Sequence, residues 1–254
     1  MHKSLLASLC AALLLGACAT SSQEISKEQK IGELYLRAGN ADVMANNFTS
    51  ALQNLQKAEK YVPKNEDLWI AFGLAYFGKK NFKRSEESFQ KALALNPKNN
   101  FARNDLGAIY LEQAKYAQAQ REFETVLKDL AFSDQYKTLY NLGVIQYKLG
   151  KYISAEDYFT RSVKESSSFC LGWTKLSDAQ MQLGKREEAI ASLRSASSGL
   201  CYNNTEAHYH LGLLLTQERQ TDKARDKFEE ITQRFPNSPW AKLSEDKLRA
   251  LAHK

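Results

Sequence analysis

The chain has 254 residues, of which 43% are hydrophobic and 25% are charged. This length suits one large globular domain or an elongated repeat array, and four Pro and 12 Gly residues, several of them regularly placed, favour the array. The formal charge of +6 falls to +5 without Lys3, and basic residues are interspersed with acidic ones, which argues against nucleic-acid binding.

Residues 1–17 are laid out as an export signal. They contain a short basic start at Lys3, an apolar core from Leu5 to Leu15, and small residues after it. The alternative, a transmembrane helix, is disfavoured because the apolar run is too short to span a bilayer.

The stretch from Leu15 to Cys18 resembles the bacterial lipobox, in which the signal is cut before the cysteine and that cysteine is acylated. The resemblance implies that Cys18 carries the lipid; the alternative is an ordinary signal peptide with a chance cysteine. Residues 18–30 are expected to form a flexible, lipidated tether. Ala19 stands where an Asp would imply inner-membrane retention, so we expect a lipid-anchored protein at the periplasmic face of the outer membrane.

Helical periodicity dominates the rest of the chain, and no long stretch alternates polar and apolar residues as a strand would. The clearest stretch predicts two helices, because its spaced residues fall on one face of each: Trp69, Phe72, Gly73 and Tyr76, then Phe89 and Ala92. Gly73 leaves room for the second helix, and Pro97 ends the pair. These residues resemble the tetratricopeptide repeat (TPR) signature, whose period is 34 residues.

The TPR resemblance implies an all-α, right-handed superhelix of six helix-turn-helix repeats across residues 31–238. The repeats are expected at about 32–65, 66–99, 100–133, 136–169, 170–203 and 205–238. Asp42 occupies the usual Tyr position, Ser85 replaces the usual Ala, and Ser177 replaces the packing Gly. A two-residue slip of register between Leu130 and Gln135 predicts one longer turn.

Two features concern the ends of helices. Gly150 and Gly184 each lie at the end of a first helix, where a left-handed residue is expected. Residues 239–254 are predicted to form a capping helix that covers the last repeat with one apolar stripe: Trp240, Leu243, Leu248 and Leu251.

Cys170 and Cys201 are the cysteines outside the signal and the lipid site, and export would place both in an oxidising compartment. Cys170 starts the first helix of the fifth repeat and Cys201 follows its second helix. Because paired helices are antiparallel, these two ends lie on one side of the repeat, and we expect a disulfide. The alternative is two buried free thiols.

No pattern indicates an active site, a metal site or a cofactor site. His208 and His210 are two residues apart and so point in different directions on a helix, and the phosphate-loop, nucleophile-elbow and zincin motifs do not occur. We therefore expect no catalysis, no metal and no cofactor.

In the TPR arrangement, the inner wall is formed by first-helix residues that face away from the second helix. Here those positions are rich in apolar, aromatic and Asn side chains: Leu36, Asn40, Ile70, Leu74, Phe77, Phe101, Asn104, Leu111, Tyr140, Asn141, Val144, Tyr147, Tyr209 and Leu213. The resemblance implies a partner-binding groove; the alternative is packing between repeats. The family's carboxylate clamp needs a Lys where Leu36 stands beside Asn40, so we expect an apolar or amphipathic peptide segment as ligand.

The combination of lipobox, tether, six repeats and capping helix resembles the pilotin lipoproteins of type IV pilus systems, the PilF/PilW/Tgl group. The resemblance implies a non-enzymatic lipoprotein that binds secretin subunits and promotes their outer-membrane targeting and multimerisation. We expect a monomer that binds no nucleic acid. Two alternatives are a TPR lipoprotein adaptor that scaffolds envelope proteases or peptidoglycan enzymes, and an envelope enzyme with an unnoticed catalytic domain.

Overall fold

The computed structural model describes residues 26–252, and every regular element in that range is a helix, which confirms the predicted all-α class. The predicted leader and the lipid site Cys18 lie outside the described residues. The α-helices are α1 (Lys27–Met44), α2 (Phe48–Glu59), α3 (Glu66–Gly78), α4 (Phe82–Leu95), α5 (Asn100–Glu112), α6 (Tyr116–Val126), α7 (Gln135–Lys148), α8 (Tyr152–Glu165), α9 (Cys170–Gln182), α10 (Arg186–Ala196), α11 (Thr205–Gln217), α12 (Thr221–Arg234) and α13 (Pro239–Ala252). A short 3₁₀ helix, η1 (Gly199–Cys201), precedes α11.

The described chain forms two units that divide between Lys64 and Asn65. The first contains α1 and α2, and α1 begins inside the predicted tether because Ser26 caps it by accepting a hydrogen bond from the Gln29 amide. Asp42, at the usual Tyr position, accepts hydrogen bonds from two side chains of α2, Ser50 at 2.7 Å and Asn54 at 2.9 Å. A polar contact therefore replaces the aromatic one between these two helices.

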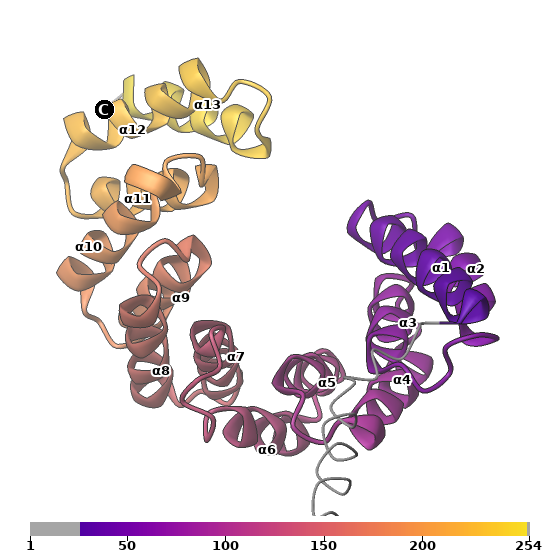
Figure 1. Cartoon of the computed structure of the whole chain (residues 1–254). Coiled ribbons are helices and arrows are strands. Elements are labelled where there is room, and N and C mark those ends of the chain that lie inside the picture. Colours follow the sequence, from indigo (N-terminus) through magenta and orange to yellow (C-terminus); the bar gives the residue numbers. More distant parts are fainter. Residues whose placement is uncertain (1–25, 253–254) are drawn as a thin grey trace, which may run out of the picture. The chain divides into compact units, whose positions relative to one another are not determined.

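The second unit contains five helix pairs, α3–α4 to α11–α12, which follow one another in chain order, and α13 beside the last of them (Figure 1). In four of these pairs, all except α9–α10, a first-helix Gly meets a Phe of the second helix. A Cβ atom on Gly73 would lie 2.6 Å from the Phe89 ring, and one on Gly143 would lie 2.6 Å from the Phe159 ring. Close approach of the paired helices therefore depends on the missing side chain.

The fifth repeat has Ser177 in place of this Gly, and its second helix presents Leu193 where the other four pairs of the second unit present Phe. Ser177 is 2% exposed, and its hydroxyl donates to the Thr174 carbonyl at 2.7 Å. In the second repeat, the hydroxyl of Ser85 donates across the pair to the Gly73 carbonyl, also at 2.7 Å.

Each first helix ends in a left-handed residue. The prediction for Gly150 and Gly184 is confirmed, with φ of +72° and +75°. The other repeats place non-glycine residues in the same conformation at the same repeat position: Asn46, Lys80, Ala114 and Arg219. The turn between paired helices is thus the same in every repeat, although only two repeats supply the residue that favours it.

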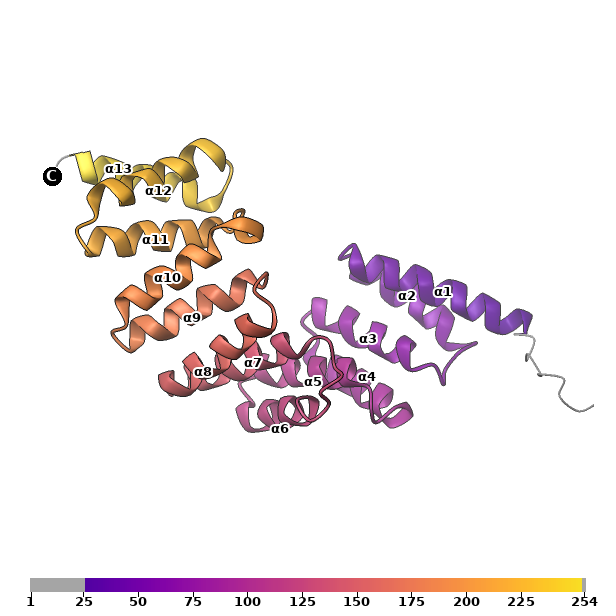
Figure 2. The same ribbon diagram turned by 60° about the vertical axis from the view of Figure 1, so that its left-hand side comes forward.

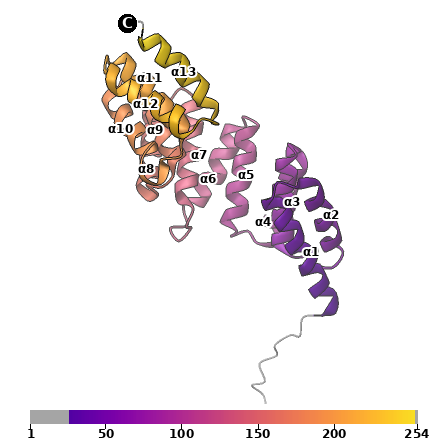
Figure 3. The same cartoon turned by 90° about the horizontal axis from the view of Figure 1, so that it is seen from above.

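The predicted long turn lies between α6 and α7, across residues 127–134, whereas residues 96–99 connect α4 to α5. α13 lies alongside α11 and α12 (Figures 2 and 3). Its apolar stripe differs from the prediction, because Leu243 is 43% exposed. Residues spaced three and four apart define the buried face instead: Ala241, Ser244, Leu248 and Leu251.

Candidate binding surface on the first helices

The first-helix face is the set of first-helix side chains that point away from their own second helix. Most of the predicted positions lie half-buried on it: Ile70, Leu74, Phe77, Asn104, Leu111, Tyr140, Asn141, Val144, Tyr147 and Leu213. Asn40 and Phe101 are exposed. Many of the half-buried apolar groups also pack against the core, so they serve both the fold and the accessible surface.

Two predicted positions do not contribute accessible surface. Leu36 is 6% exposed and Tyr209 is 7% exposed. The Tyr209 ring lies 4.9 Å from the Trp240 ring of α13 and 5.8 Å from the Phe228 ring, measured between centroids. The capping helix therefore covers Tyr209, which the repeat pattern alone treats as a wall residue.

Four of the predicted residues come together in one cavity between α5 and α7. This cavity has a volume of about 270 Å³ and is lined by Leu111, Glu112, Ala114, Tyr116, Tyr140, Asn141, Val144 and Lys148. Its lining is more polar than apolar, and it combines the apolar groups of Leu111, Tyr140 and Val144 with the Asn141 amide and the Lys148 ammonium group. Within the described part of the chain, no hydrogen bond or ion pair occupies either of these two groups. Leu111, Tyr140 and Val144 offer contact to an apolar side chain of a ligand, and the Asn141 amide is placed to bond the ligand backbone.

The remaining predicted positions do not share one site. Leu213 lines a smaller cavity of about 140 Å³ between α9 and α11, together with Met181 and His210. Phe101 instead contacts the long turn, where its ring lies 4.9 Å from the Phe132 ring. Asn104 accepts a hydrogen bond from Thr138 of the next repeat at 3.0 Å, so its carbonyl group is used in packing between repeats. The predicted groove residues therefore lie in separate environments: the cavity between α5 and α7, the cavity between α9 and α11, and contacts between repeats.

Ionisable groups on this face were not identified from the sequence. Burial raises the pKa of Asp105 to about 6, although the charge of Lys137 and a hydrogen bond from Asn104 act in the opposite direction. On α9, the Lys175 ammonium group lies 2.7 Å from Asp178. Burial acts to lower the pKa of Lys175, but the hydrogen bond to Asp178 and the nearby acidic groups together outweigh it, so the pKa is raised. The repeat pattern places these residues on the first helices, but it does not show that they are buried.

A disulfide joins Cys170, at the start of α9, to Cys201 in η1, with the Cα atoms 5.4 Å apart. It closes a loop of 31 residues, which in the chain-entropy model stabilises the fold by about 3 to 4 kcal/mol. It also fixes the segment that leads into α11.

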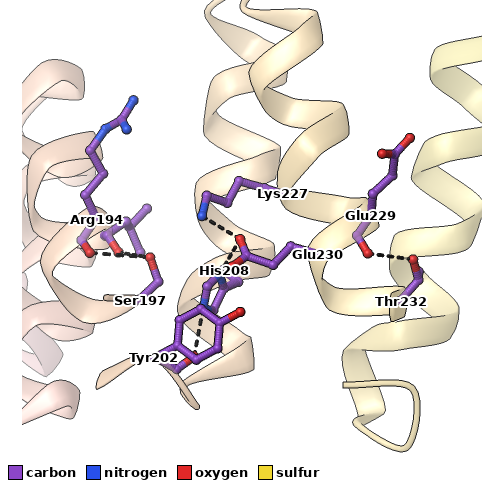
Figure 4. A network of polar contacts seen from close by, with 9 residues as sticks. Arg194, Ser197, Tyr202, His208, Lys227, Glu229, Glu230 and Thr232 are labelled. Carbon is purple, nitrogen blue, oxygen red and sulfur yellow. Dashed lines mark hydrogen bonds and ion pairs between the residues drawn. The ribbon is translucent and has the colours of Figure 1, made fainter. Parts of the chain in front are cut away.

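Figure 4 shows the polar network beside this segment. His208 is fully buried; one ring nitrogen lies 2.8 Å from the Tyr202 carbonyl oxygen and the other lies 3.4 Å from a Glu230 carboxylate oxygen. Glu230 also accepts a hydrogen bond from Lys227 at 2.7 Å. Burial lowers the pKa of His208, so the ring is neutral at pH 7. His208 therefore joins a turn to two helices, whereas His210 lines the cavity between α9 and α11.

Residues 26–252 contain neither a metal-binding cluster nor a membrane-spanning helix. In that range no group of three or more His, Cys, Asp or Glu side chains is placed to hold a metal ion. No helix within the same range has the length and apolar character needed to cross a membrane.

Tetratricopeptide repeat family models match most of the described chain. One matches residues 36–100 and 174–239, which together exceed half of the chain, a second matches residues 76–143, and a third matches residues 136–169. The chain matches no curated protein sequence.

Solved structures with a similar fold include PilF, PilW and Cut9, each under 25% identical to this chain. Pseudomonas aeruginosa PilF has a TM-score of 0.72 and 19% identity, covering 89% of this chain and 99% of that one. PilW, a widely conserved type IV pilus biogenesis factor, has a TM-score of 0.73 and 20% identity, covering 84% and 98%. Cut9, from the APC/C hetero-tetramer Cut9–Hcn1, has a TM-score of 0.70 and 16% identity, covering 89% and 44%. At these identities the likeness concerns the fold.

Proposed function

Because this chain belongs to the tetratricopeptide repeat family, we propose that it is a non-enzymatic binding protein whose first-helix face takes an apolar segment of a protein partner. The observation that carries this proposal is the cavity between α5 and α7. There Leu111, Tyr140 and Val144 offer apolar contact, and the Asn141 amide is available to a peptide backbone. A single small cavity gives modest affinity, so further contacts along the same face are part of the proposal.

The partner that we propose is a secretin subunit of a type IV pilus system, with this protein acting as its pilotin. The sequence supports this role through the lipobox at Cys18, the short segment before the first repeat and the number of repeats. Structural likeness to the type IV pilus biogenesis factor PilW over nearly its whole length is compatible with it. In this role the acyl chains at Cys18 locate the protein at the outer membrane and the first-helix face supplies recognition. Holding both on one chain raises the effective concentration of bound subunit at the membrane.

Affinity capture from envelope extract tests the binding step. The unaltered chain is expected to retain a secretin subunit, and the pair Asn141→Ala with Val144→Ser is expected to reduce its recovery by about tenfold or more, since a buried contact and a backbone hydrogen bond are lost together. Arg121→Ala, on the exposed side of α6, is the matched control and should leave recovery unchanged. Equal recovery with the paired variant would remove the cavity from the binding site, and recovery of envelope proteins without any secretin would contradict the pilotin role.

Cell fractionation tests the anchor separately. Cys18→Ala removes the acceptor of the acyl chains, so the protein is expected to move from the membrane fraction to the soluble periplasm. Membrane association that persists in this variant would show that Cys18 is not what holds the protein there.

A further inference from the structure

The turns that connect the two helices of each repeat in the second unit are strongly basic. These turns comprise residues 79–81, 113–115, 149–151, 183–185 and 218–220, and together they contain six basic side chains and one acidic side chain. The turns between successive repeats of the same unit, from residues 96–99 to residues 235–238, contain two basic and two acidic side chains. The positive charge is thus concentrated on one of the two sets of turns.

The basic turns lie along one edge of the second unit, which we call the basic edge. Ion pairs connect neighbours on it: Lys115 lies 3.6 Å from Glu86 of the preceding repeat, and Lys185 lies 2.6 Å from Glu156 of the preceding repeat. Arg186 lies 3.5 Å from Glu218 of the following repeat. These pairs offset the charges of Lys115, Lys185 and Arg186, so the unpaired positive charge at the turn between α7 and α8 comes from Lys148 and Lys151.

Aliphatic side chains stand among these charges at the turn between α7 and α8. Ile153 is 75% exposed and Leu149 is 45% exposed, and both are flanked by the exposed Lys148 and Lys151. Neither lysine takes part in an ion pair with another residue of the range 26–252. Leu149 and Ile153 expose aliphatic surface to water next to two ammonium groups that form no ion pair. Exposed apolar surface of this kind indicates an interaction site. It matches a lipid bilayer, where aliphatic groups enter the headgroup region and lysines meet phosphate groups.

We propose that the basic edge docks on anionic phospholipid, with Leu149 and Ile153 entering the bilayer surface and Lys148 and Lys151 binding headgroup phosphates. This contact does not involve the acyl chains at Cys18, and of its four residues Lys148 alone also lines the first-helix cavity. Lysines alone would suit any polyanion, including a nucleic acid. The two exposed aliphatic side chains are what favour a bilayer, because a nucleic acid offers them no apolar medium.

Flotation of the full chain with vesicles tests the proposal. The probe vesicles contain phosphatidylglycerol mixed with phosphatidylcholine, and vesicles of phosphatidylcholine alone are the reference. We expect binding to the anionic vesicles to exceed binding to the reference and to weaken between 0.1 and 0.5 M salt. Replacing both lysines by Gln should weaken anionic binding about fivefold per charge removed. Replacing Leu149 and Ile153 by Ser should weaken it by a similar overall factor.

The matched control lies on the turns between repeats. Leu130 is 88% exposed beside Lys128, so Leu130→Ser with Lys128→Gln changes the same residue types at the other set of turns and should leave binding unaltered. All variants keep the same amino-terminal segment, whose own affinity for vesicles cancels in the comparison. Their helical circular dichroism and melting temperature should match those of the parent, because the altered side chains are exposed.

Three results would overturn the proposal. The first is equal binding to anionic and neutral vesicles, and the second is an equal loss in the Leu130 and Lys128 control. The third is a loss with the lysine variants but none with the aliphatic variants, combined with competition by short DNA, which would assign the edge to a polyanion instead. Secretin capture by the Leu149 and Ile153 variant in detergent extract should remain normal, because neither residue lines the first-helix cavity, so failure here is distinguishable from failure of the proposed function.

Discussion

Asp105 has an acidic side chain in a place where water reaches it poorly. Burial raises its pKa from 3.8 to about 6, even though Lys137 is close enough to oppose this. Between pH 3.8 and about pH 6, the Asp105 carboxyl keeps its proton in the folded state but has lost it in the unfolded state. Stability therefore falls as pH rises from about 4 to about 6, by at most about 3 kcal/mol, and remains at the lower level above pH 6.

Asp105→Asn removes this ionisation and should raise the free energy of unfolding at pH 7. The gain over the parent should shrink toward zero at pH 4, where the parent carboxyl is protonated in both states. Urea unfolding at several pH values between 4 and 7 measures the difference. Asp226→Asn, on the exposed side of α12, is the control and should show no such pH-dependent gain. A gain that is the same at pH 4 and pH 7 would contradict the assignment to Asp105 ionisation.

Ala114 shows a second effect at the scale of one residue. It has a φ of +55°, a conformation that costs an alanine about 1 to 2 kcal/mol, whereas glycine adopts it without that cost. Ala114→Gly should therefore raise stability by about 0.5 to 1 kcal/mol after the greater chain entropy of unfolded glycine is included. The reverse change, Gly150→Ala, should lower it, since nothing lies within 4 Å of the added Cβ and only the backbone is affected. Thermal melting of both variants measures the two signs, and a lower melting temperature for Ala114→Gly would contradict the argument.

The sequence indicates this turn conformation only where glycine marks it. Gly150 and Gly184 predict it correctly, but Lys80, Ala114 and Arg219 carry no such signal in their own side chains. They adopt it because the paired helices must meet at the same distance in every repeat, which is a property of the repeat and not of the residue. The pKa of Asp105 was likewise beyond sequence reasoning, because it depends on what the neighbouring repeat places over the carboxyl.

At the scale of the helix pair, the Gly and Phe positions depend on one another. Gly143 faces Phe159, whereas the fifth repeat combines Ser177 with Leu193. Gly143→Ser should therefore lower stability by about 1 to 3 kcal/mol through overpacking. Adding Phe159→Leu copies the combination of the fifth repeat and should make the double variant more stable than the sum of the two single changes implies. Denaturant unfolding of the four proteins gives the coupling, and simple additivity would show that the two positions are independent.

Local cap residues mark where some helices begin, as the side chains of Asn65 and Asn99 do before α3 and α5. What the pattern could not give is how the capping helix covers the final first helix. The predicted stripe included Leu243, which is exposed, and the predicted wall included Tyr209, which stacks on Trp240. Both errors have one cause, since α13 has no repeat position and its rotation is set by packing against α11 and α12.

Across the second unit, some connections between repeats are held by a covalent link and others are not. Residues 127–134 form a long turn without a covalent link, and Leu130 within it is 88% exposed. Leu200 is exposed to a similar degree, 87%, but it lies in the segment that the Cys170–Cys201 disulfide holds. By exposure alone, Leu130 and Leu200 are equivalent sites for a protease. The disulfide near Leu200 is what distinguishes them. Because repeats contact mainly their neighbours, a break at one turn need not unfold the helices on either side.

Limited digestion with chymotrypsin, which cuts after large apolar residues, should therefore cleave after Leu130 before it cleaves after Leu200. The reason is that a protease needs a segment that can open locally, and the disulfide restricts opening around Leu200. Timed digestion with mass analysis of cuts between residues 26 and 252 measures the order. Cys170→Ser with Cys201→Ser should accelerate cleavage after Leu200 while leaving the rate after Leu130 unchanged. Faster cleavage after Leu200 in the parent, or acceleration at both sites in the variant, would show that the two turns are not independent parts of the array.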